Sequence, residues 1–293
     1  MGGKLTIRRL STPGEMLEVE RLQTIIWPGS EVDIVPSHLM LTVAHNGGVA
    51  IGACDGDQMV GFVFGFLGTD SASPNRPAMA RLKHCSHMLG VDPRYRDAGV
   101  GFALKCAQRE AVIEQGIRLV TWTYDPLESR NAYLNVRRLG AVCRTYLREA
   151  YGPMRDALNQ GLPSDRFQVD WWVTSPRVRS RIDGTRPPLD LANFLDAGVS
   201  IVNAAELRED GLPRPSPALQ PLTGNMLLVE IPPVFSDLRR KDLPLAGEWR
   251  VHTRHIFESA FAQGYLVTDF VHLKGERAPR SFYLLSQGEA QLG

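Results

Sequence analysis

The chain has 293 residues, of which 43% are hydrophobic and 22% charged, so it can bury the core of one large domain or two smaller ones. Its 33 basic and 32 acidic residues nearly cancel, which argues against a protein that follows nucleic-acid phosphates. The sequence has no run of about 20 apolar residues and begins MGGKLTIRRL, without the apolar centre of a signal peptide. We therefore expect a cytoplasmic protein that binds neither nucleic acid nor membrane.

The first 175 residues show the hydrophobic patterns of strands and helices. Residues 5–10 alternate between apolar and polar side chains, which predicts a strand, and residues 13–26 place apolar side chains at helical spacing. Asp55-Gly56-Asp57 is a typical hairpin turn between two strands. The remaining patterns predict helices over residues 36–48, 100–115 and 129–141, and strands over residues 83–91, 118–126, 142–152 and 165–175.

The predicted order, β-α-α-β-β-β-α-β-α-β-β, is typical of a mixed α/β sheet flanked by helices. We therefore predict one domain over residues 1–175. Residues 176–188 are polar, basic and proline-rich, and we interpret them as a linker. Residues 189–293 predict a smaller α+β domain of unknown role, with a helix over residues 244–265 and strands over 225–232, 265–273 and 280–286.

Four cysteines are scattered along the chain without a CxxC pair: Cys54, Cys85, Cys106 and Cys143. This spacing is not that of metal ligands, so no metal cofactor is expected. We interpret the cysteines as reduced, mostly buried small residues. A catalytic thiol is the alternative for any one of them.

A turn rich in glycine and arginine separates the predicted strand at 83–91 from the helix at 100–115. Gly99 and Gly101 let the backbone curl tightly and let a ligand approach without interference from a Cβ atom. The helix N-terminus adds unpaired N–H groups and a partial positive charge, and Arg94 and Arg96 add cationic donors. These features predict an anion site suited to a pyrophosphate. The turn matches neither the GxGxxG pattern nor a loop followed by GK[ST].

The motifs around this turn resemble the GNAT superfamily of N-acetyltransferases. The pattern R-x-x-G-x-G is matched by Arg96, Gly99 and Gly101, and the element order and the later helix ending NVRRLGA also match. The resemblance covers residues 5–173 and says little about the rest. Two stretches, TYDPLESRNAYLNVRRLGA and YG…LNQGLPSDRFQVDWW, resemble an uncharacterised bacterial subgroup with a C-terminal extension. Relatives in that subgroup occur beside N-acylamino-acid racemases and acylases, which implies N-acylation of an amino acid from an acetyl or succinyl donor.

The resemblance implies that the turn binds the pyrophosphate of acetyl-CoA or another acyl-CoA, and that the preceding strand hydrogen-bonds the pantetheine arm. A backbone N–H of Leu89 or Val91 would then polarise the thioester. The residues implied in coenzyme binding are Met88, Leu89, Val91, Arg96, Ala98, Gly99, Val100, Gly101 and Asn131. For Asn131, a helix cap is the alternative role.

Acyl transfer to an amine needs a proton acceptor for the amine and an acid for the departing thiolate. In the family a tyrosine of the later helix often supplies the acid, but that position holds Val136 here. Tyr133, one turn earlier, is our candidate acid, and a core or stacking tyrosine is the alternative. His87 is our candidate base because imidazole has a suitable pKa, although a structural histidine is more common on a strand.

Two charged residues are candidates for binding the acyl acceptor, a small-molecule amine. Asp125, at the end of its strand, could bind the amine, although Asp-Pro also simply ends a strand. Arg166 could bind a substrate carboxylate, and a surface ion pair with Asp165 is the alternative.

Three functions remain open from the sequence. The first is an acyl-CoA-dependent N-acyltransferase, and the second is an inactive coenzyme-binding or regulatory module that lost its acid at Val136. The third places function in the C-terminal region, as a dimerisation or substrate-closing element. A homodimer is one expected state, and removal of the residues after Pro188 would then change the oligomer size.

Overall fold

The structure, a computed structural model, describes residues 5–29, 33–70, 74–152, 161–187, 189–274 and 279–288. The chain forms two compact units. The first comprises residues 1–122, 155–160 and 172–174, and the second comprises residues 123–154, 161–171 and 175–293. This division differs from the expected boundary near residue 175, because residues 123–154 group with the C-terminal part of the chain.

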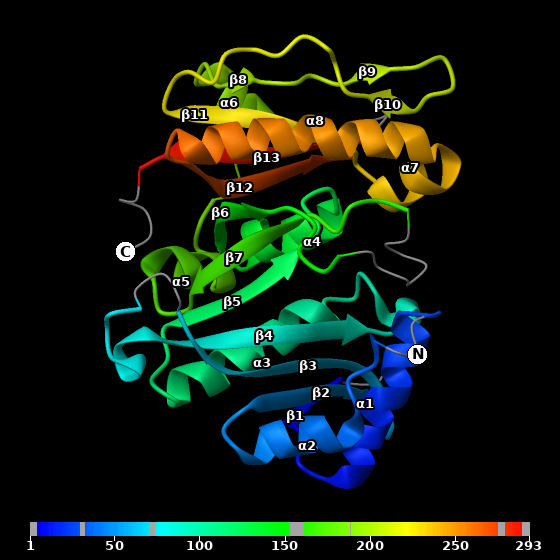
Figure 1. Ribbon diagram of the computed structural model, residues 1–293, viewed down its shortest axis with the longest axis vertical. Coiled ribbons are helices and arrows are strands. Elements are labelled where there is room, and N and C mark those ends of the chain that lie inside the picture. The colour runs from blue at the N-terminus through cyan, green and yellow to red at the C-terminus, as the bar shows by residue number, and fades with distance from the viewer. Residues whose placement is uncertain are drawn as a thin grey trace. The chain divides into compact units, whose positions relative to one another are not determined.

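The first unit is a mixed sheet with helices on both faces (Figure 1). Its strand order is β1-β2-β3-β4-β5, antiparallel as far as β4, and β5 is parallel to β4. The mixed sheet confirms the predicted fold class. Its elements are β1 (Thr6–Arg9), α1 (Pro13–Ile26), α2 (Ser37–His45), β2 (Val49–Asp55), β3 (Gln58–Thr69), η2 (Ala78–Arg81), β4 (Leu82–Val91), η3 (Pro93–Tyr95), α3 (Val100–Glu114) and β5 (Leu119–Tyr124), of which the last two residues fall in the second unit.

Helix α1 has the bounds that its sequence pattern predicts, and its start is fixed by local chemistry. Thr12 and Glu15 form a capping box in which each side chain accepts from the other residue's backbone N–H, and Pro13 follows the cap. The buried face of α1 joins Phe62 and Phe64 of β3 in one core cluster. A fully buried leucine such as Leu22 contributes about 2 kcal/mol to this packing.

In the second unit the strand order is β7-β6-β12-β13-β11-β8, and β9 and β10 form a separate pair. Its elements are α4 (Ser129–Ala132), η4 (Tyr133–Arg138, a π-helix), β6 (Val142–Leu147), β7 (Arg166–Trp172), α5 (Pro176–Ile182), α6 (Leu191–Asp196), β8 (Ser200–Ile201), β9 (Glu206–Leu207), β10 (Pro213–Arg214), β11 (Met226–Ile231), α7 (Phe235–Lys241), α8 (Leu243–Ala262), β12 (Tyr265–Leu273) and β13 (Arg280–Gln287).

The C-terminal strands complete the sheet of the second unit, because β12 pairs with β6 at Val267 and Cys143. Side chains of β12 and β13 alternate between the two faces of the sheet. Helix α8 covers one face (Figure 1), where the Phe257 ring lies 4.7 Å from Phe167 and 5.4 Å from Tyr283. On the other face Leu191 and Phe194 of α6 pack in a separate cluster with Val271 and Phe282.

The expected linker contains a helix, α5, over Pro176–Ile182. Ser175 caps it, and Val178 is buried. Arg181 donates to the buried carboxylate of Asp269 at 2.6 Å, and Arg177 donates to the carbonyls of Gly140 and Thr268. Arg177 and Arg181, which belong to the basic segment that the sequence suggested was a linker, therefore anchor the helix. The last residue of that expected linker, Pro188, lies outside the described residues.

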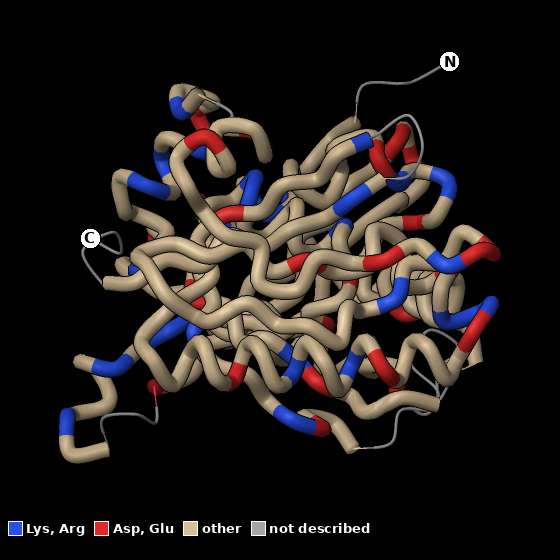
Figure 2. Tube along the Cα trace, turned by 90° about the horizontal axis from the view of Figure 1, so that it is seen from above, with Lys and Arg blue, Asp and Glu red and all other residues tan. Residues whose placement is uncertain are grey.

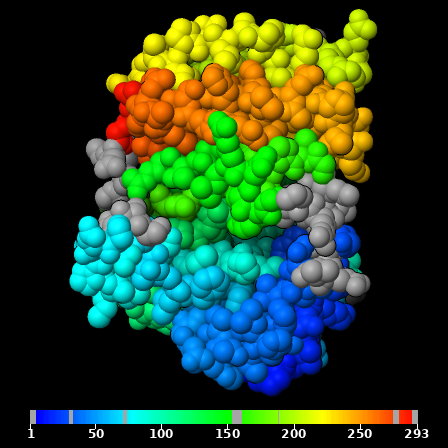
Figure 3. All heavy atoms as spheres, in the orientation of Figure 1, coloured from blue at the N-terminus to red at the C-terminus, as the bar shows by residue number. Residues whose placement is uncertain are grey.

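Residues 202–225, the long segment before β11, lie along α8. In Figure 3 the yellow atoms of this segment are adjacent to the orange atoms of α8. Trp249 of α8 donates its indole N–H to the Pro213 carbonyl at 2.8 Å. Basic and acidic residues are interspersed along the trace (Figure 2). Among the described helices, none is long and apolar enough to span a membrane.

Candidate functional site

Strand β4 has a partly open edge just before the glycine-rich turn. It pairs with β5 only at His84–Val120 and Cys85–Thr121. On its other edge, the register with β3 shifts between Phe64 and Phe66, which places a bulge at residues 86–87 of β4. The implied pantetheine-binding residues Met88, Leu89 and Val91 follow this bulge and are partly buried. Beyond Cys85, the strand therefore offers backbone groups to an extended ligand.

The turn after β4 exposes part of its backbone. Asp97 and Gly99 have positive φ angles of 63° and 80°, and both are exposed. Gly99 caps α3 without a side-chain bond, and the first bond of the helix is Ala103 N to Gly99 O at 3.0 Å. Within the described chain, the N–H groups of residues 98–101 make no recorded hydrogen bond. Successive N–H groups of this kind at a helix N-terminus make a backbone concavity that suits an anion.

The two arginines of the turn differ in their surroundings. Arg94 donates to both carboxylate oxygens of Asp92, at 3.1 and 2.7 Å. Asp92 is buried, and its Arg94 partner lowers the pKa of that carboxyl. Arg96 is exposed beside the concavity. Arg96 is therefore the better placed of the two to contact an anion held there.

A buried polar network lies between α3, β4 and β5, and the sequence analysis missed it. Lys105 Nζ donates to Ser86 Oγ at 2.8 Å and to Gln108 Oε1 at 3.1 Å, and it lies 3.6 Å from the centre of the Trp122 ring. Gln108 Nε2 lies 3.1 Å from Nε2 of His84. Burial lowers the pKa of Lys105 to about 7 and that of His84 to about 4. A lysine inside the apolar face of α3 was the available signal.

His87, the candidate base, is exposed on β4. Its ring lies 6.3 Å from that of Phe64 and 5.9 Å from that of Phe66, and partial desolvation lowers its pKa. A neutral imidazole can accept a proton. The role of His87 as the base of the reaction stays a prediction.

In the second unit, Asp125 directly follows β5 and is held by Arg250 of α8. Arg250 donates to its two carboxylate oxygens at 2.8 and 2.5 Å, and the Leu127 N–H donates to Oδ1 at 2.9 Å. Arg166 is almost fully buried, with Nη1 3.9 Å from the Asp125 carboxylate. The structure thus brings together the two residues predicted to bind the acceptor.

Asp165 belongs to a separate ion pair and does not hold Arg166 through its carboxylate. Arg254 donates to both Asp165 oxygens at 2.7 and 2.9 Å, and the Tyr146 hydroxyl donates to it at 2.6 Å. Arg166 instead donates to the Asp165 backbone carbonyl at 2.9 Å. Its guanidinium also lies 5.6 Å from the ring centre of Tyr151.

Glu128 is a second residue of interest that the sequence analysis missed. It lies three residues after Asp125 and is partly buried, and its N–H donates to the Asp125 carbonyl at 3.0 Å. Burial and then the charge of Asp125 raise the pKa of Glu128 to about 7. Its closeness to Asp125 in the sequence was the available signal.

Tyr133 and Asn131 are both exposed at the start of the helical segment after β5. Val136, at the family's usual tyrosine position, is fully buried in the π-helix. The wider turn of a π-helix changes which residues share a face. Tyr133 is therefore accessible, whereas Val136 packs in the core.

All four cysteines are free thiols, and Cys54 and Cys143 are buried. Burial raises the pKa of Cys85 and that of Cys143. Among the described residues, no group of three or more His, Cys, Asp or Glu side chains could hold a metal ion.

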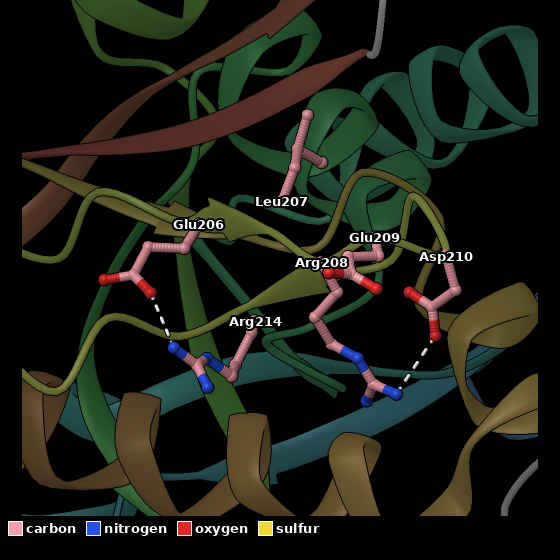
Figure 4. A pocket seen from close by; sticks show the side chains of 6 residues that line it. All are labelled: Glu206, Leu207, Arg208, Glu209, Asp210 and Arg214. Atoms are coloured by element: carbon pink, nitrogen blue, oxygen red, sulfur yellow. Dashed lines mark hydrogen bonds and ion pairs between the residues drawn. The ribbon is translucent and has the colours of Figure 1, made fainter.

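A depression in the second unit is lined by charged residues of β9, β10 and the turn between them (Figure 4). Arg214 pairs with Glu206 at 2.7 Å, and Arg208 pairs with Asp210 at 3.0 Å. These side chains neutralise one another on an exposed surface.

No family model and no curated protein matches the chain. Solved structures similar to it include the ribosomal-protein-S18-alanine N-acetyltransferase of Escherichia coli, with 14% identity and a TM-score of 0.43 over 58% of this chain and 94% of that one. Arabidopsis thaliana NAA60 in complex with acetyl-CoA has 18% identity and a TM-score of 0.46 over 58% and 99%. A GNAT-family acetyltransferase of Streptococcus pneumoniae has 14% identity and a TM-score of 0.44 over 57% and 98%.

The described strands and helices have a GNAT-like arrangement. Strands β1 to β5, the strand–turn–helix unit and the element order are those that the R-x-x-G-x-G resemblance implies. The matches to these solved structures cover 57–58% of this chain.

Proposed function

We propose that the chain is a cytoplasmic, acyl-CoA-dependent N-acyltransferase that acts on a primary amine of a small molecule, with an amino acid as the leading acceptor and acetyl or succinyl as the donor group. The observation that carries the proposal is the concavity at residues 98–101. There, N–H groups that make no hydrogen bond within the described chain lie at a helix N-terminus and suit the pyrophosphate of coenzyme A.

In this proposal, Met88, Leu89 and Val91 bind the pantetheine arm through the free edge of β4. A β4 N–H polarises the thioester as charge develops on its oxygen. The carboxylate of Asp125 attracts the acceptor's ammonium group, and Arg166 attracts an acceptor carboxylate. Tyr133 is exposed and can return a proton to the departing thiolate, and Asn131 beside it can contact the coenzyme arm.

A coenzyme-binding module without turnover is the second candidate. Burial of Val136 at the family's usual acid position favours it. Calorimetric binding of acetyl-CoA and succinyl-CoA, followed by thiol release with D- and L-amino acids and polyamines, distinguishes the two. Binding with turnover supports the enzyme, and binding without turnover supports the module.

We predict that Gly99→Glu weakens coenzyme binding by about 100-fold or more, which corresponds to about 2.7 kcal/mol. The new carboxylate enters the concavity and repels the pyrophosphate. The residue must also adopt a φ of 80°, which side chains other than glycine rarely take. Calorimetry with coenzyme A measures the effect.

Gly116→Glu is the matched control for this variant. Gly116 has a φ of 74°, and a Cβ there would meet no atom within 4 Å, as at Gly99, but it follows the opposite end of α3. We expect Gly116→Glu to share the backbone strain and keep coenzyme affinity. Equal affinity in a folded Gly99→Glu variant would remove the turn from the coenzyme site.

A further inference from the structure

The proposed reaction requires a group that takes a proton from the acceptor, because an aliphatic amine is mostly protonated at neutral pH. We propose that Glu128 of the second unit is this proton acceptor and that the ion pair between Arg250 and Asp125 positions it, a role that rests on the proposed function.

The chain between β5 and α4 places two carboxylates in one tight turn. Leu127 N donates to Asp125 Oδ1 at 2.9 Å, and Glu128 N donates to the Asp125 carbonyl at 3.0 Å. Ala132 N then donates to the Glu128 carbonyl at 3.0 Å and starts α4. The backbone of Glu128 is therefore fixed on both sides.

The turn is also fixed by residues distant in sequence. The Tyr283 hydroxyl donates to the Pro126 carbonyl at 2.8 Å, and Ser129 Oγ donates to the Pro232 carbonyl at 3.0 Å. Arg250 donates to both oxygens of Asp125. The C-terminal part of the chain thus supplies three of the anchors that hold the turn.

The two carboxylates have opposite surroundings. Asp125 is held by the bidentate Arg250 pair, whereas no hydrogen bond or ion pair of the Glu128 carboxyl is recorded within the described residues. The charged groups that act on Glu128 are Asp125, Arg239 of α7, Arg250 of α8 and Arg130 of α4, and Tyr283 of β13 also faces it. When two neighbouring carboxylates have different partners, one can stay charged in an ion pair while the other accepts a proton.

The chemistry of Glu128 suits this role. Its burial and the neighbouring charge of Asp125 raise its pKa to about 7, so its carboxylate is a stronger base than an ordinary glutamate. A proton acceptor works best when its pKa lies near the working pH.

The acceptor's ammonium group gives one proton to Glu128, which becomes a neutral carboxylic acid. The amine nitrogen then forms a bond to the thioester carbonyl carbon, and the carbon–sulfur bond breaks with its electron pair on sulfur. The second proton of the new N–C adduct goes to the thiolate, through Tyr133 in the proposed mechanism. The products are the amide and free coenzyme A.

The test is Glu128→Gln, with Glu248→Gln as the matched control because Glu248 is an exposed residue of α8. We expect Glu128→Gln to lower kcat about 100-fold or more at pH 7, with the Kd of coenzyme A unchanged. The rise of kcat with pH through about 7 in the wild type should vanish in the variant. Glu248→Gln should match the wild type.

Arg250 is tested as a positioning residue. Arg250→Met should lower kcat and move the pH profile, and Arg250→Lys should restore part of kcat because it keeps the charge but not the bidentate geometry.

Equal kcat and pH profile in wild type and Glu128→Gln would overturn the inference and leave the proposed function intact. Absence of coenzyme binding in the wild type would overturn both.

A second measurement does not depend on finding the acceptor. Carbon-13 NMR of the glutamate-labelled protein should show one carboxyl that titrates well above the ordinary glutamate range and is missing in Glu128→Gln. A Glu128 carboxyl that titrates in the ordinary range would overturn the inference.

Discussion

Lys105 is a charged side chain placed inside the core of the first unit, and its pKa links stability to pH. Its ammonium has neutral hydrogen-bond partners, Ser86 and Gln108, and lies over the Trp122 ring. Burial lowers the folded-state pKa to about 7, below the unfolded value of about 10.4. Between these two values the unfolded state binds more protons, so the free energy of unfolding rises with pH across this window. Below pH 7 the contribution no longer changes.

We predict that Lys105→Met removes this pH dependence. The free energy of unfolding of the wild type, relative to Lys105→Met, should rise by about 2–4 kcal/mol between pH 7 and pH 10, since each unit of pKa is worth about 1.4 kcal/mol. Ser86 and Gln108 can still bond to each other at 2.9 Å in the variant. Urea unfolding at pH 7, 8.5 and 10 measures the difference.

Lys83→Met is the control for Lys105→Met, because Lys83 is a partly exposed lysine on β4. It should leave the pH slope of the wild type unchanged. Parallel slopes for wild type and Lys105→Met would show that Lys105 keeps an ordinary pKa in the fold.

At the scale of elements, helix α5 is attached to its neighbours mainly by arginine side chains. Asp269 of β12 accepts from Arg137 of η4 at 3.2 Å and from Arg181 of α5 at 2.6 Å, and Arg186 approaches it to 3.4 Å. Arg181 also donates to the Arg137 carbonyl near the end of the π-helix, where a cation is favourable. One buried carboxylate therefore ties η4, α5 and β12 together.

We predict that Asp269→Asn destabilises the protein by about 3–5 kcal/mol, because it leaves buried guanidinium groups without their counter-charge. The Asp269 and Arg181 side chains are only 1% and 5% exposed, so solvent screens the pair little. Urea unfolding at pH 7 gives the value. Asp237→Asn, which breaks an exposed pair with Arg240, should change stability by less than about 1 kcal/mol. A loss below 1 kcal/mol for Asp269→Asn would show that the carboxylate does not hold these elements together.

At the scale of the whole molecule, the C-terminal part of the chain is built into the second unit. The rings of Phe257 and Tyr283 pack on Phe167 of β7, and β12 pairs with β6. Arg250 and Tyr283 hold the turn that carries Asp125 and Glu128. The C-terminal part of the chain therefore supports the residues that are proposed to bind and deprotonate the acyl acceptor.

We predict that a chain ending at residue 188 does not form a stably folded second unit. It loses α8 and β11 to β13, which exposes Phe167 and leaves β6 without its β12 partner. Near-UV circular dichroism and size-exclusion chromatography should show lost tertiary packing and aggregation. A soluble, folded fragment whose only change is a smaller oligomer would instead support a dimerisation role for the C-terminal region.

The first unit could be predicted largely from local patterns. The apolar spacing and the Thr12 cap determined α1, and the Asp55-Gly56-Asp57 turn determined the β2–β3 hairpin. The turn at Arg96–Gly101 was recognisable because glycine at a positive φ and a following helix are local properties. The predicted roles of Tyr133 and Asn131 stay predictions, and His87 is the alternative to Glu128 as the proton acceptor.

The second unit was decided by contacts between residues far apart in sequence. The sequence alone determined that α8, β12 and β13 form, because their apolar periodicity is local. It did not reveal that β12 pairs with β6, that Arg250 holds Asp125, or that Lys105 reaches Ser86. Strand pairing and burial of a charge depend on which surfaces meet after the chain folds. An arginine or lysine in an apolar helix pattern has the same local signal whether it faces solvent or a buried carboxylate, so only the tertiary structure decided these roles.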